Sequence, residues 1–371
     1  MNVLISRIHL KLDVGLPAII LSILFLSVLC VLFLYCQPAL EQRMERLFKP
    51  YSGNVPGASV MVIQDGIPVL IRTFGFAHLE KKIPVKAETN FRLASVSKQF
   101  TAMAVLLLMQ EDQLDFSTPL TTIFPEFPEY GREITIGHLL HHQSGLLDYE
   151  TLVPDTVSVQ VKDHDVLAVM MQQDSLYFEP GTEYRYSNTG YAILAMVVQK
   201  ISGQSFSEFL HERIFAPLDM KTTVAFEKDV NLVSNRAFGY RTTESGFEPR
   251  DQSAYSAVLG DGGIYSNVHD LFLWDQALYG NVLLDDKLMT KVFTPATLKD
   301  GTPTDYGCGW RIDTFMGHER VHHTGQTCGF TTVIQRYPQA RTSILVLTNR
   351  DEPMVGDLAD QISKLYLGDP S

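Results

Sequence analysis

Ser95 and Lys98 have the three-residue spacing that places two side chains on one face of a helix. A serine hydroxyl is a poor nucleophile until a neighbouring base removes its proton, and a lysine in this position could act as that base. The segment 96–109 is apolar on nearly every side, which predicts a buried helix with Ser95 in its first turn. Unpaired backbone N–H groups at that turn would suit a developing oxyanion. The alternative is a capping serine next to a solvated lysine.

A second pattern, Tyr-x-Asn, begins at Tyr186 and ends at Asn188. It lies between a turn sequence with Pro and Gly and an apolar segment, so it is predicted on a short connection, where catalytic groups are often held. The same pattern also begins at Tyr265 and at Tyr279. The former leads into a capped helix and the latter marks a turn, so the pattern at 186 is the better candidate.

A third pattern, His-Thr-Gly, occupies residues 323–325 and occurs once. It lies between two segments predicted to be strands, 306–312 and 329–334, with a polar turn near Gly317. A glycine inside a strand often marks the close approach of a ligand or of another backbone. Taken alone, the pattern is equally compatible with a hairpin that carries an incidental histidine and glycine.

Together the three patterns, in this order, resemble the class C branch of the serine β-lactamase and penicillin-binding-protein superfamily. In the class A branch the second and third patterns are Ser-Asp-Asn and Lys-Thr-Gly. The resemblance covers residues 56–349 and implies an α+β fold (an α/β sandwich), in which helices flank an antiparallel β-sheet and a mainly helical subdomain is inserted. The catalytic serine is expected where the two parts meet. The segments that carry the resemblance are Phe91–Thr101, Ile134–Leu146, Tyr184–Tyr191, Gly262–Ser266, Tyr306–Trp310 and His323–Gly325.

The resemblance also implies a role for each matching residue. Ser95 would be the nucleophile that becomes acylated, and Lys98 with Tyr186 would handle its proton, with neither named as the sole base. Asn188 would hold the lysine ammonium and the amide or ester group of the substrate. The backbone N–H groups of Ser95 and Gln326 would form the oxyanion hole, each contributing about 3 kcal/mol to transition-state stabilisation.

His323 departs from the efficient class C β-lactamases, which carry lysine at this position, next to the equivalents of Thr324 and Gly325. A lysine is a permanent cation that suits the carboxylate of a β-lactam, whereas histidine is mostly neutral at pH 7. With these three residues as substrate-binding groups, the resemblance points to the esterase, D,D-carboxypeptidase and D-amidase branches, and it implies no cofactor. We therefore expect a serine hydrolase that forms an acyl-enzyme with a small-molecule or peptide ester or amide, including D-amino-acid peptides. A weak β-lactamase and a non-catalytic penicillin-binding sensor of peptidoglycan are the alternatives.

Composition and charge fit an enzyme-sized globular protein. The 371 residues are 45% apolar, enough for a large core, and the net charge of −12 argues against binding of nucleic acid. The oligomeric state is not indicated. Strands are predicted at Ser59–Gln64 and Val69–Thr73, around a turn at Asp65-Gly66. The predicted organisation is a short tail at 1–13, an apolar segment at 14–36, a linker at 37–50 and a hydrolase domain at 51–371, with sheet parts near 51–115 and 256–371 and a helical insert near 116–255.

Residues 14–36 contain no charged side chain and are long enough for a membrane helix of about 20 residues. We expect an uncleaved anchor, because no small-x-small pair follows the apolar stretch and Tyr35 before Cys36 is too bulky for a lipoprotein site. A cleaved signal peptide, giving a secreted or periplasmic protein, is the alternative. Basic residues on both sides leave the orientation open. The resemblance implies a single-pass protein whose hydrolase domain lies outside the cytoplasm.

His138, His141 and His142 have helical spacing, and with His322 and His323 they could be taken for metal ligands. No cysteine pair and no His-Glu-x-x-His pattern accompanies them, so we expect no metal. His138, His141 and His142 are instead expected to satisfy backbone groups at the end of a helix before Ser144 and Gly145.

Cys308 and Cys328 are nearly equidistant from the turn near Gly317, so a hairpin could place them opposite each other or one pair apart. Directly opposed residues have Cβ atoms roughly 4.5–5.5 Å apart, whereas a disulfide needs about 3.5–4.5 Å. A disulfide that pins the strand carrying His323 and a pair of small buried thiols are both compatible with the spacing, and we expect the thiols.

Overall fold

A computed structural model of the protein describes residues 40–367. The contacts divide the chain after Lys49 into two units, and the second unit, residues 50–371, carries the sheet and the candidate site. Residues 40–47 are helical, where the sequence predicted part of a linker. The apolar segment 14–36 lies outside the described residues. Among the helices within 40–367, none is both long and apolar enough to cross a bilayer.

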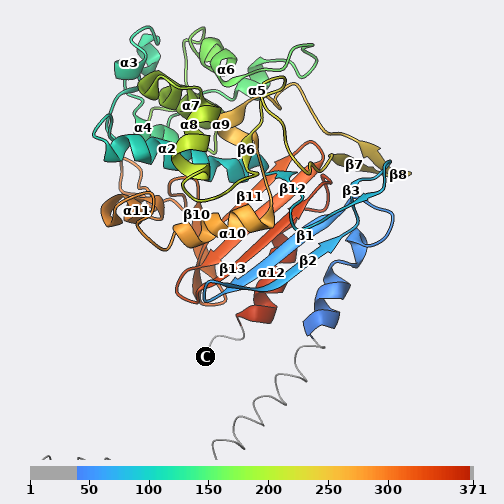
Figure 1. Ribbon diagram of the computed structural model, residues 1–371. Coiled ribbons are helices and arrows are strands. Elements are labelled where there is room, and N and C mark those ends of the chain that lie inside the picture. Colours follow the sequence, from blue (N-terminus) through green and yellow to red (C-terminus); the bar gives the residue numbers. More distant parts are fainter. Residues whose placement is uncertain (1–39, 368–371) are drawn as a thin grey trace, which may run out of the picture. The chain divides into compact units, whose positions relative to one another are not determined.

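The second unit is built on a six-stranded antiparallel sheet, whose strands in spatial order are β10 (Arg311–Phe315), β11 (His318–Thr327), β12 (Phe330–Tyr337), β13 (Thr342–Thr348), β1 (Ala58–Gln64) and β2 (Ile67–Phe74). The N-terminal hairpin joins the C-terminal strands, because β1 pairs directly with β13 (Figure 1). Every residue of β13 is buried, which requires a cover on both faces of the sheet.

The two faces of this sheet are covered by two helices, α10 (Val268–Ala277) and α12 (Gly356–Tyr366). Neighbouring residues of β12 show the division, because side chains alternate between the faces along a strand. Arg336 pairs with the buried Asp275 of α10, with 2.7 Å between Nε and Oδ1. Tyr337, on the other face, donates a hydrogen bond to Ser363 of α12 at 2.9 Å. Each face therefore has its own polar link to the helix that covers it.

Beyond the sheet, the helices pack mainly around α7 (Asn188–Ser202), which is largely apolar and buried (Figure 1). The Ser187 hydroxyl caps α7 by accepting from the Gly190 N–H at 3.1 Å, and Gly203 ends the helix in the left-handed conformation. The other helices are α2 (Lys98–Gln110), α3 (Leu120–Ile123), α4 (Ile136–Leu140), α5 (Tyr149–Leu152), α6 (Asp163–Met170), α8 (Phe206–Leu210), α9 (Leu259–Gly262) and α11 (Asp286–Val292), with 3-10 turns η1 (Lys49–Tyr51), η2 (Ala94–Ser97) and η3 (Glu129–Gly131) and a π-helical turn η4 (His211–Phe215). Short strands form three small sheets: β3 (Phe76–His78) with β4 (Ile83–Pro84), β5 (Phe91–Arg92) with β9 (Ile264–Ser266) and β6 (Val224–Ala225), and β7 (Tyr240–Thr243) with β8 (Gly246–Pro249).

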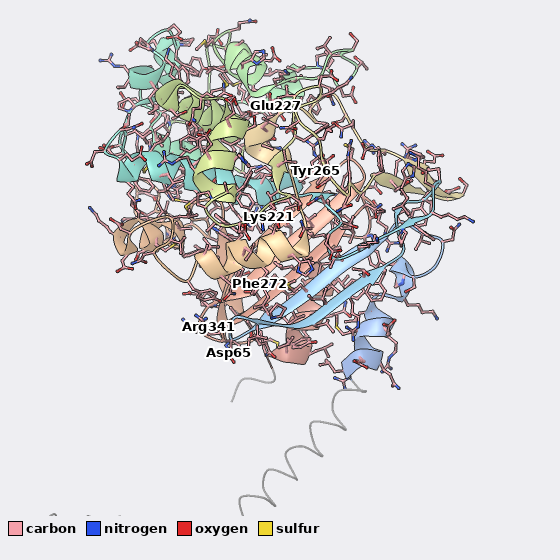
Figure 2. The ribbon with its side chains drawn as sticks, viewed as in Figure 1. Asp65, Lys221, Glu227, Tyr265, Phe272 and Arg341 are labelled. Atoms are coloured by element: carbon pink, nitrogen blue, oxygen red, sulfur yellow. The ribbon has the colours of Figure 1, made fainter. Side chains whose placement is uncertain are left out.

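The hairpin predicted near the start of the domain is confirmed. Asp65 and Gly66 both have positive φ, 49° and 75°, as the two-residue turn between β1 and β2 requires. The Asp65 N–H also donates to the Arg341 carbonyl at 2.9 Å, so this turn meets the turn between β12 and β13 at one end of the sheet (Figure 2).

The strand predicted at 306–312 is wrong for most of its length. In the structure β10 begins only at Arg311. Gly309 has a φ of 81°, and this left-handed conformation interrupts an extended chain. The predicted turn near Gly317 and the strand predicted at 329–334 are confirmed, with β12 covering nearly all of the latter.

Candidate active site

Ser95 lies in η2, a short 3-10 turn that continues directly into α2. The preceding residue, Ala94, has a φ of 49°, which is uncommon for a residue with a side chain and turns the chain sharply into the helix. The sheet holds this entry, because Thr332 of β12 donates through Oγ1 to the Leu93 carbonyl oxygen at 2.7 Å. The predicted buried helix is thus present, and the serine lies in a tighter turn at its start.

The Lys98 side chain is fully buried, and its ammonium group contacts three acceptors. It donates to Ser95 Oγ at 3.1 Å, to Asn188 Oδ1 at 2.7 Å and to the Asp261 carbonyl oxygen at 2.9 Å. Since an ammonium group has three donors, this set uses all of them. The structure therefore gathers the predicted serine, lysine and asparagine around one charge. It adds a backbone acceptor that the sequence reasoning missed, because a main-chain carbonyl carries no signal in the residue pattern.

The Tyr186 ring lies beside the Lys98 ammonium group, and its hydroxyl makes no hydrogen bond to that group. Lys98 Nζ lies 5.0 Å from the centre of the Tyr186 ring. The phenol oxygen is buried and has no hydrogen-bond partner within the part of the chain that the structure describes. Because an unsatisfied buried hydroxyl costs about 1–3 kcal/mol, a substrate or water group that bonds it would be favoured.

Ser95 opens onto a small cavity of about 90 Å³. Gln326, which was predicted to supply the second oxyanion donor, lines the same cavity from β11. The two residues expected to supply the donors therefore line one cavity, although they come from elements that are far apart in the sequence. The polar part of the lining includes Ser95, Glu150, Asn188, Asp261 and Gln326.

Gly325 lies where β11 passes close to the turn that carries the serine. A Cβ atom added to Gly325 would lie 2.2 Å from the Leu93 carbonyl oxygen and 2.4 Å from Thr332 Oγ1, well inside van der Waals contact. The glycine therefore marks the close approach of another backbone, one of the two explanations that the sequence allowed. This contact sets the distance between Gln326 and Ser95.

His323 is buried behind Tyr186 and is not part of the cavity lining. Its Nδ1 lies 2.7 Å from the Thr324 carbonyl oxygen, which can only accept, so Nδ1 carries the proton. The Tyr306 hydroxyl then donates to Nε2 at 2.9 Å, and both ring nitrogens are satisfied in the neutral form. Burial, with the Lys98 ammonium nearby, lowers the pKa of His323 well below its usual value. The ring is therefore neutral at pH 7.

Two carboxyl groups near Asn188 had no signal in the sequence, because each lies in a short helix, α5 or α9, and is not part of a recognised motif. Glu150, on α5 at the exposed rim of the cavity, accepts a hydrogen bond from Asn188 Nδ2 at 3.0 Å. Asp261 is buried, and the Tyr149 hydroxyl donates to its Oδ2 at 2.9 Å. Desolvation raises the pKa of both carboxyl groups. The Asp261 carboxylate adds to this effect on Glu150, whereas the Lys98 ammonium opposes it on Asp261.

The three histidines around α4 bind backbone groups, as predicted, but His138 caps the start of the helix, and only His141 and His142 lie at its end. His138 Nδ1 accepts from the Thr135 N–H at 3.2 Å, and the ring of His141 bonds the Gly137 carbonyl at 2.9 Å. His142 accepts from a backbone N–H of the Tyr-x-Asn segment. Within residues 40–367, no group of three or more His, Cys, Asp or Glu side chains is placed to hold a metal ion.

Cys308 and Cys328 are both free, which rules out the disulfide and agrees with the thiols that were expected. The hairpin does not oppose them, because β10 pairs Arg311 with His322 and begins only after Cys308. Cys308 is buried and its thiol donates to the Lys291 carbonyl at 3.6 Å. Cys328 is half-buried, so only one of the two matches the buried thiol that was expected.

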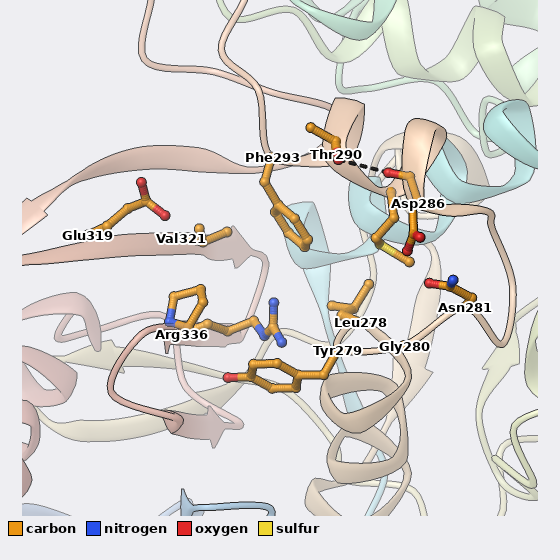
Figure 3. Close-up of a pocket in the computed structure, with 12 residues that line it drawn as sticks. Leu278, Tyr279, Gly280, Asn281, Asp286, Thr290, Phe293, Glu319, Val321 and Arg336 are labelled. Atoms are coloured by element: carbon orange, nitrogen blue, oxygen red, sulfur yellow. Dashed lines mark hydrogen bonds between the residues drawn. The ribbon is translucent and has the colours of Figure 1, made fainter.

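A larger cavity, of about 430 Å³, lies between the end of α10, α11 and the strands β11 and β12 (Figure 3). Tyr279, Phe293 and Arg336 form part of its wall, and none of the predicted site residues lines it. The Arg336 guanidinium is already paired with Asp275, so its charge is compensated. The Ser95 cavity is therefore the candidate active site.

Comparisons with known proteins agree on one family. A model described as Beta-lactamase matches residues 39–367. Penicillin-binding protein 4* of Bacillus subtilis (strain 168) is 32% identical over 309 residues, which cover 79% of this chain and 68% of the relative. A D-aminopeptidase of Brucella canis is 30% identical over 340 residues, covering 90% of this chain and 63% of the relative. The chain thus spans less than two thirds of the length of that D-aminopeptidase.

The fold is also similar to solved structures. The crystal structure of a penicillin-binding protein from Bacillus halodurans matches with a TM-score of 0.74 and 29% sequence identity, covering 88% of this chain and 99% of that chain. The mixed fold of antiparallel sheet and flanking helices is therefore the expected one.

Proposed function

The chain belongs to the beta-lactamase family, and from this premise we propose that it is a serine hydrolase that cleaves amide or ester bonds through an acyl-enzyme. The observation that carries the proposal is the contact of Ser95 Oγ with the buried Lys98 ammonium, at 3.1 Å. Acyl transfer needs a nucleophile held against a proton-handling group, together with donors that bind the oxyanion. Ser95 and Gln326, whose N–H groups would bind the oxyanion, line the cavity, and Lys98 contacts Ser95.

In the proposed mechanism Lys98 and Tyr186 share one proton between amine and phenolate, so the pair has one basic site. Ser95 Oγ attacks the carbonyl carbon of the substrate, and its proton passes to that basic site. The backbone N–H groups of Ser95 and Gln326 bind the oxyanion of the tetrahedral intermediate. The pair then gives a proton to the leaving amine or alcohol, and a water molecule releases the acyl group by the reverse sequence. Asn188 keeps the lysine in place through its 2.7 Å hydrogen bond.

We infer further that the substrate is an amide or short peptide with a free amino group next to the scissile carbonyl, as in a D-amino-acid amide. Glu150 supports this inference, because its carboxyl group lies at the cavity rim, 3.0 Å from Asn188 Nδ2, where it would pair with a substrate ammonium group. The same carboxylate would repel the carboxylate of a β-lactam, which makes β-lactam hydrolysis the weaker alternative. The similarity to a D-aminopeptidase supports the same substrate class.

Turnover of D-alanine p-nitroanilide, its N-acetyl derivative and the L-isomer tests the proposal. Ser95→Ala should abolish turnover and also covalent labelling by a serine-directed phosphonate. Glu150→Gln should raise KM for the free amine by about tenfold and change KM for the N-acetyl derivative by less than about twofold. The reason is that only the free amine has an ammonium group that can pair with the Glu150 carboxylate. A wild-type protein that is labelled once by a phosphonate or penicillin, and turns over no amide or ester, would be a sensor and would refute hydrolysis.

We also propose that residues 14–36 anchor the protein in a membrane, with the hydrolase domain outside the cytoplasm. The support is the uncharged, apolar sequence of this segment. Extraction should require detergent, and the mature protein should begin near Met1. A soluble mature form that begins between Cys36 and Glu41 would show a cleaved signal peptide instead.

A further inference from the structure

His142 makes two hydrogen bonds that bracket Tyr186 along the chain. Its carbonyl oxygen accepts from the Arg185 N–H at 2.9 Å, and its ring nitrogen Nδ1 accepts from the Ser187 N–H at 3.0 Å. These donors belong to the residues directly before and directly after the tyrosine. A single residue, 45 positions upstream of Ser187, therefore fixes the backbone on both sides of the phenol.

The backbone of His142 is strained in a way that glycine or asparagine would avoid. It has a φ of 58°, in the left-handed region. It follows α4, where the Gln143 N–H donates to the His138 carbonyl at 2.8 Å, the pattern of a helix end at which glycine or asparagine is usual. Glycine is easier to accommodate than histidine in this conformation, and the histidine side chain makes contacts here that glycine could not make.

The ring of His142 contributes contacts as well as the Nδ1 acceptor. It is 1% exposed and packs against the rings of Tyr186 and Tyr306, with centroid distances of 4.4 Å to each. Burial, with the Lys98 ammonium nearby, lowers the pKa of His142 well below its usual value, so Nδ1 stays free to accept. The ring packs beside Tyr186, while the hydrogen bonds hold the backbone on either side of it, so the positioning is assigned to the hydrogen bonds.

We propose that His142 is the positioning residue of the active site, which holds Tyr186 beside Lys98. The proposal rests on the proposed function, in which the tyrosine handles the proton of Ser95. His142 does not line the Ser95 cavity, so any effect on the reaction has to pass through its neighbours. A misplacement of roughly 1 Å at a catalytic group can lower a rate by about 100-fold.

Two substitutions separate the hydrogen bond from the bulk of the ring. His142→Phe keeps a flat ring against Tyr186 but leaves the Ser187 N–H buried without an acceptor. His142→Asn keeps an acceptor atom at the position of Nδ1 and suits the left-handed backbone. With p-nitrophenyl acetate as the probe, we expect kcat to fall by about 10- to 100-fold in His142→Phe and by less than about threefold in His142→Asn, with KM nearly constant in both.

A double-mutant cycle with Tyr186→Phe distinguishes positioning from a general structural effect. If His142 acts through the phenol, adding His142→Phe to Tyr186→Phe should lower kcat by less than about twofold more, because the two changes disable the same group. All variants are compared as folded protein, checked by circular dichroism. If His142→Phe does not fold, His142→Ala, which has no ring to misfit, takes its place in the cycle.

Three results would overturn the proposal: multiplicative losses in the double mutant, a wild-type kcat in folded His142→Phe, or a large loss of kcat in folded His142→Asn. A wild-type kcat in Tyr186→Phe would also overturn it, by removing the role of the tyrosine in the proposed mechanism. That failure is distinguishable from the others, since it is measured without any change at His142.

Discussion

Replacing Gly325 by alanine would force apart two elements that the proposed reaction needs together. The added Cβ atom would lie 2.2 Å from the Leu93 carbonyl oxygen, and ordinary contact begins at 3.4 Å, so β11 and η2 must separate by the difference, about 1.2 Å. The opposing atom belongs to the backbone, so no side-chain rotation relieves the clash. Gln326 moves with β11 and Ser95 stays with η2, so their N–H groups no longer fit around one oxyanion.

We expect Gly325→Ala to lower kcat by about 100- to 1,000-fold, the usual effect of losing one oxyanion-hole donor. An overpacked site typically costs about 1–3 kcal/mol, so the thermal midpoint should fall by several degrees while the protein still folds. The assays are steady-state kinetics with p-nitrophenyl acetate and thermal unfolding followed by circular dichroism. Phosphonate labelling of Ser95 should slow in parallel with kcat.

Gly356→Ala is the matched control. Its Cβ atom would lie 3.7 Å from Thr324 Cγ2, an ordinary contact with the same strand, β11. Gly356 is the first residue of α12, a position where alanine is well accepted. We expect kcat within about twofold of the wild type for this variant. A folded Gly325→Ala protein with wild-type kcat would refute the reasoning, since the spacing between β11 and η2 would then not matter for the oxyanion.

Three further predictions concern stability and thiol chemistry. Burial lowers the pKa of five histidines, to about 4 for His141 and His322, and raises the pKa of three carboxyl groups, to about 7 for Asp163. Because the histidines outnumber the carboxyl groups, the unfolded chain binds more protons than the folded protein between about pH 4 and 6.5. The free energy of unfolding should therefore fall as the pH drops through this window, and urea melts at several pH values that show no such fall would contradict it. Asp275→Ala leaves the buried Arg336 guanidinium without its carboxylate partner, so the free energy of unfolding measured by urea denaturation should fall by about 3–5 kcal/mol. A fall of less than about 1 kcal/mol would be inconsistent with the ion pair. Cys328 should react with a thiol reagent in the native protein, and the buried Cys308 only after unfolding. Equal reactivity of the two thiols in the native protein would contradict the burial of Cys308.

The catalytic side chains could be proposed from the sequence because their chemistry restricts the residue type. Ser95, Lys98 and Asn188 are each the kind of group that acyl transfer requires, and they meet in the structure. The acceptor at Asp261 could not be found in this way, since every residue has a carbonyl group. The two hydrogen bonds that His142 makes on either side of Tyr186 could not be predicted from the sequence either, because one of them uses the main chain of His142.

The fold was predictable where local chemistry decides it. The turn at Asp65-Gly66 has residues that tolerate positive φ, so the hairpin could be placed to within a few residues. At 306–312 the same reasoning failed, because the aromatic residues favour a strand while long-range packing requires Gly309. A Cβ atom there would lie 2.8 Å from the Lys98 carbonyl oxygen, a contact invisible in a local window of sequence.

The pairing of β1 with β13 affects how the protein folds while it is synthesised on the ribosome. The Gly57 N–H donates to Asn349 Oδ1, 292 residues away, so the sheet closes only when nearly the whole domain has been synthesised. At about 5–20 residues per second, the first hairpin waits roughly 15–60 s with the edge of β1 unpaired. An open, apolar strand edge is a template for aggregation, so chaperones should bind preferentially to nascent chains that stall before β13 is made.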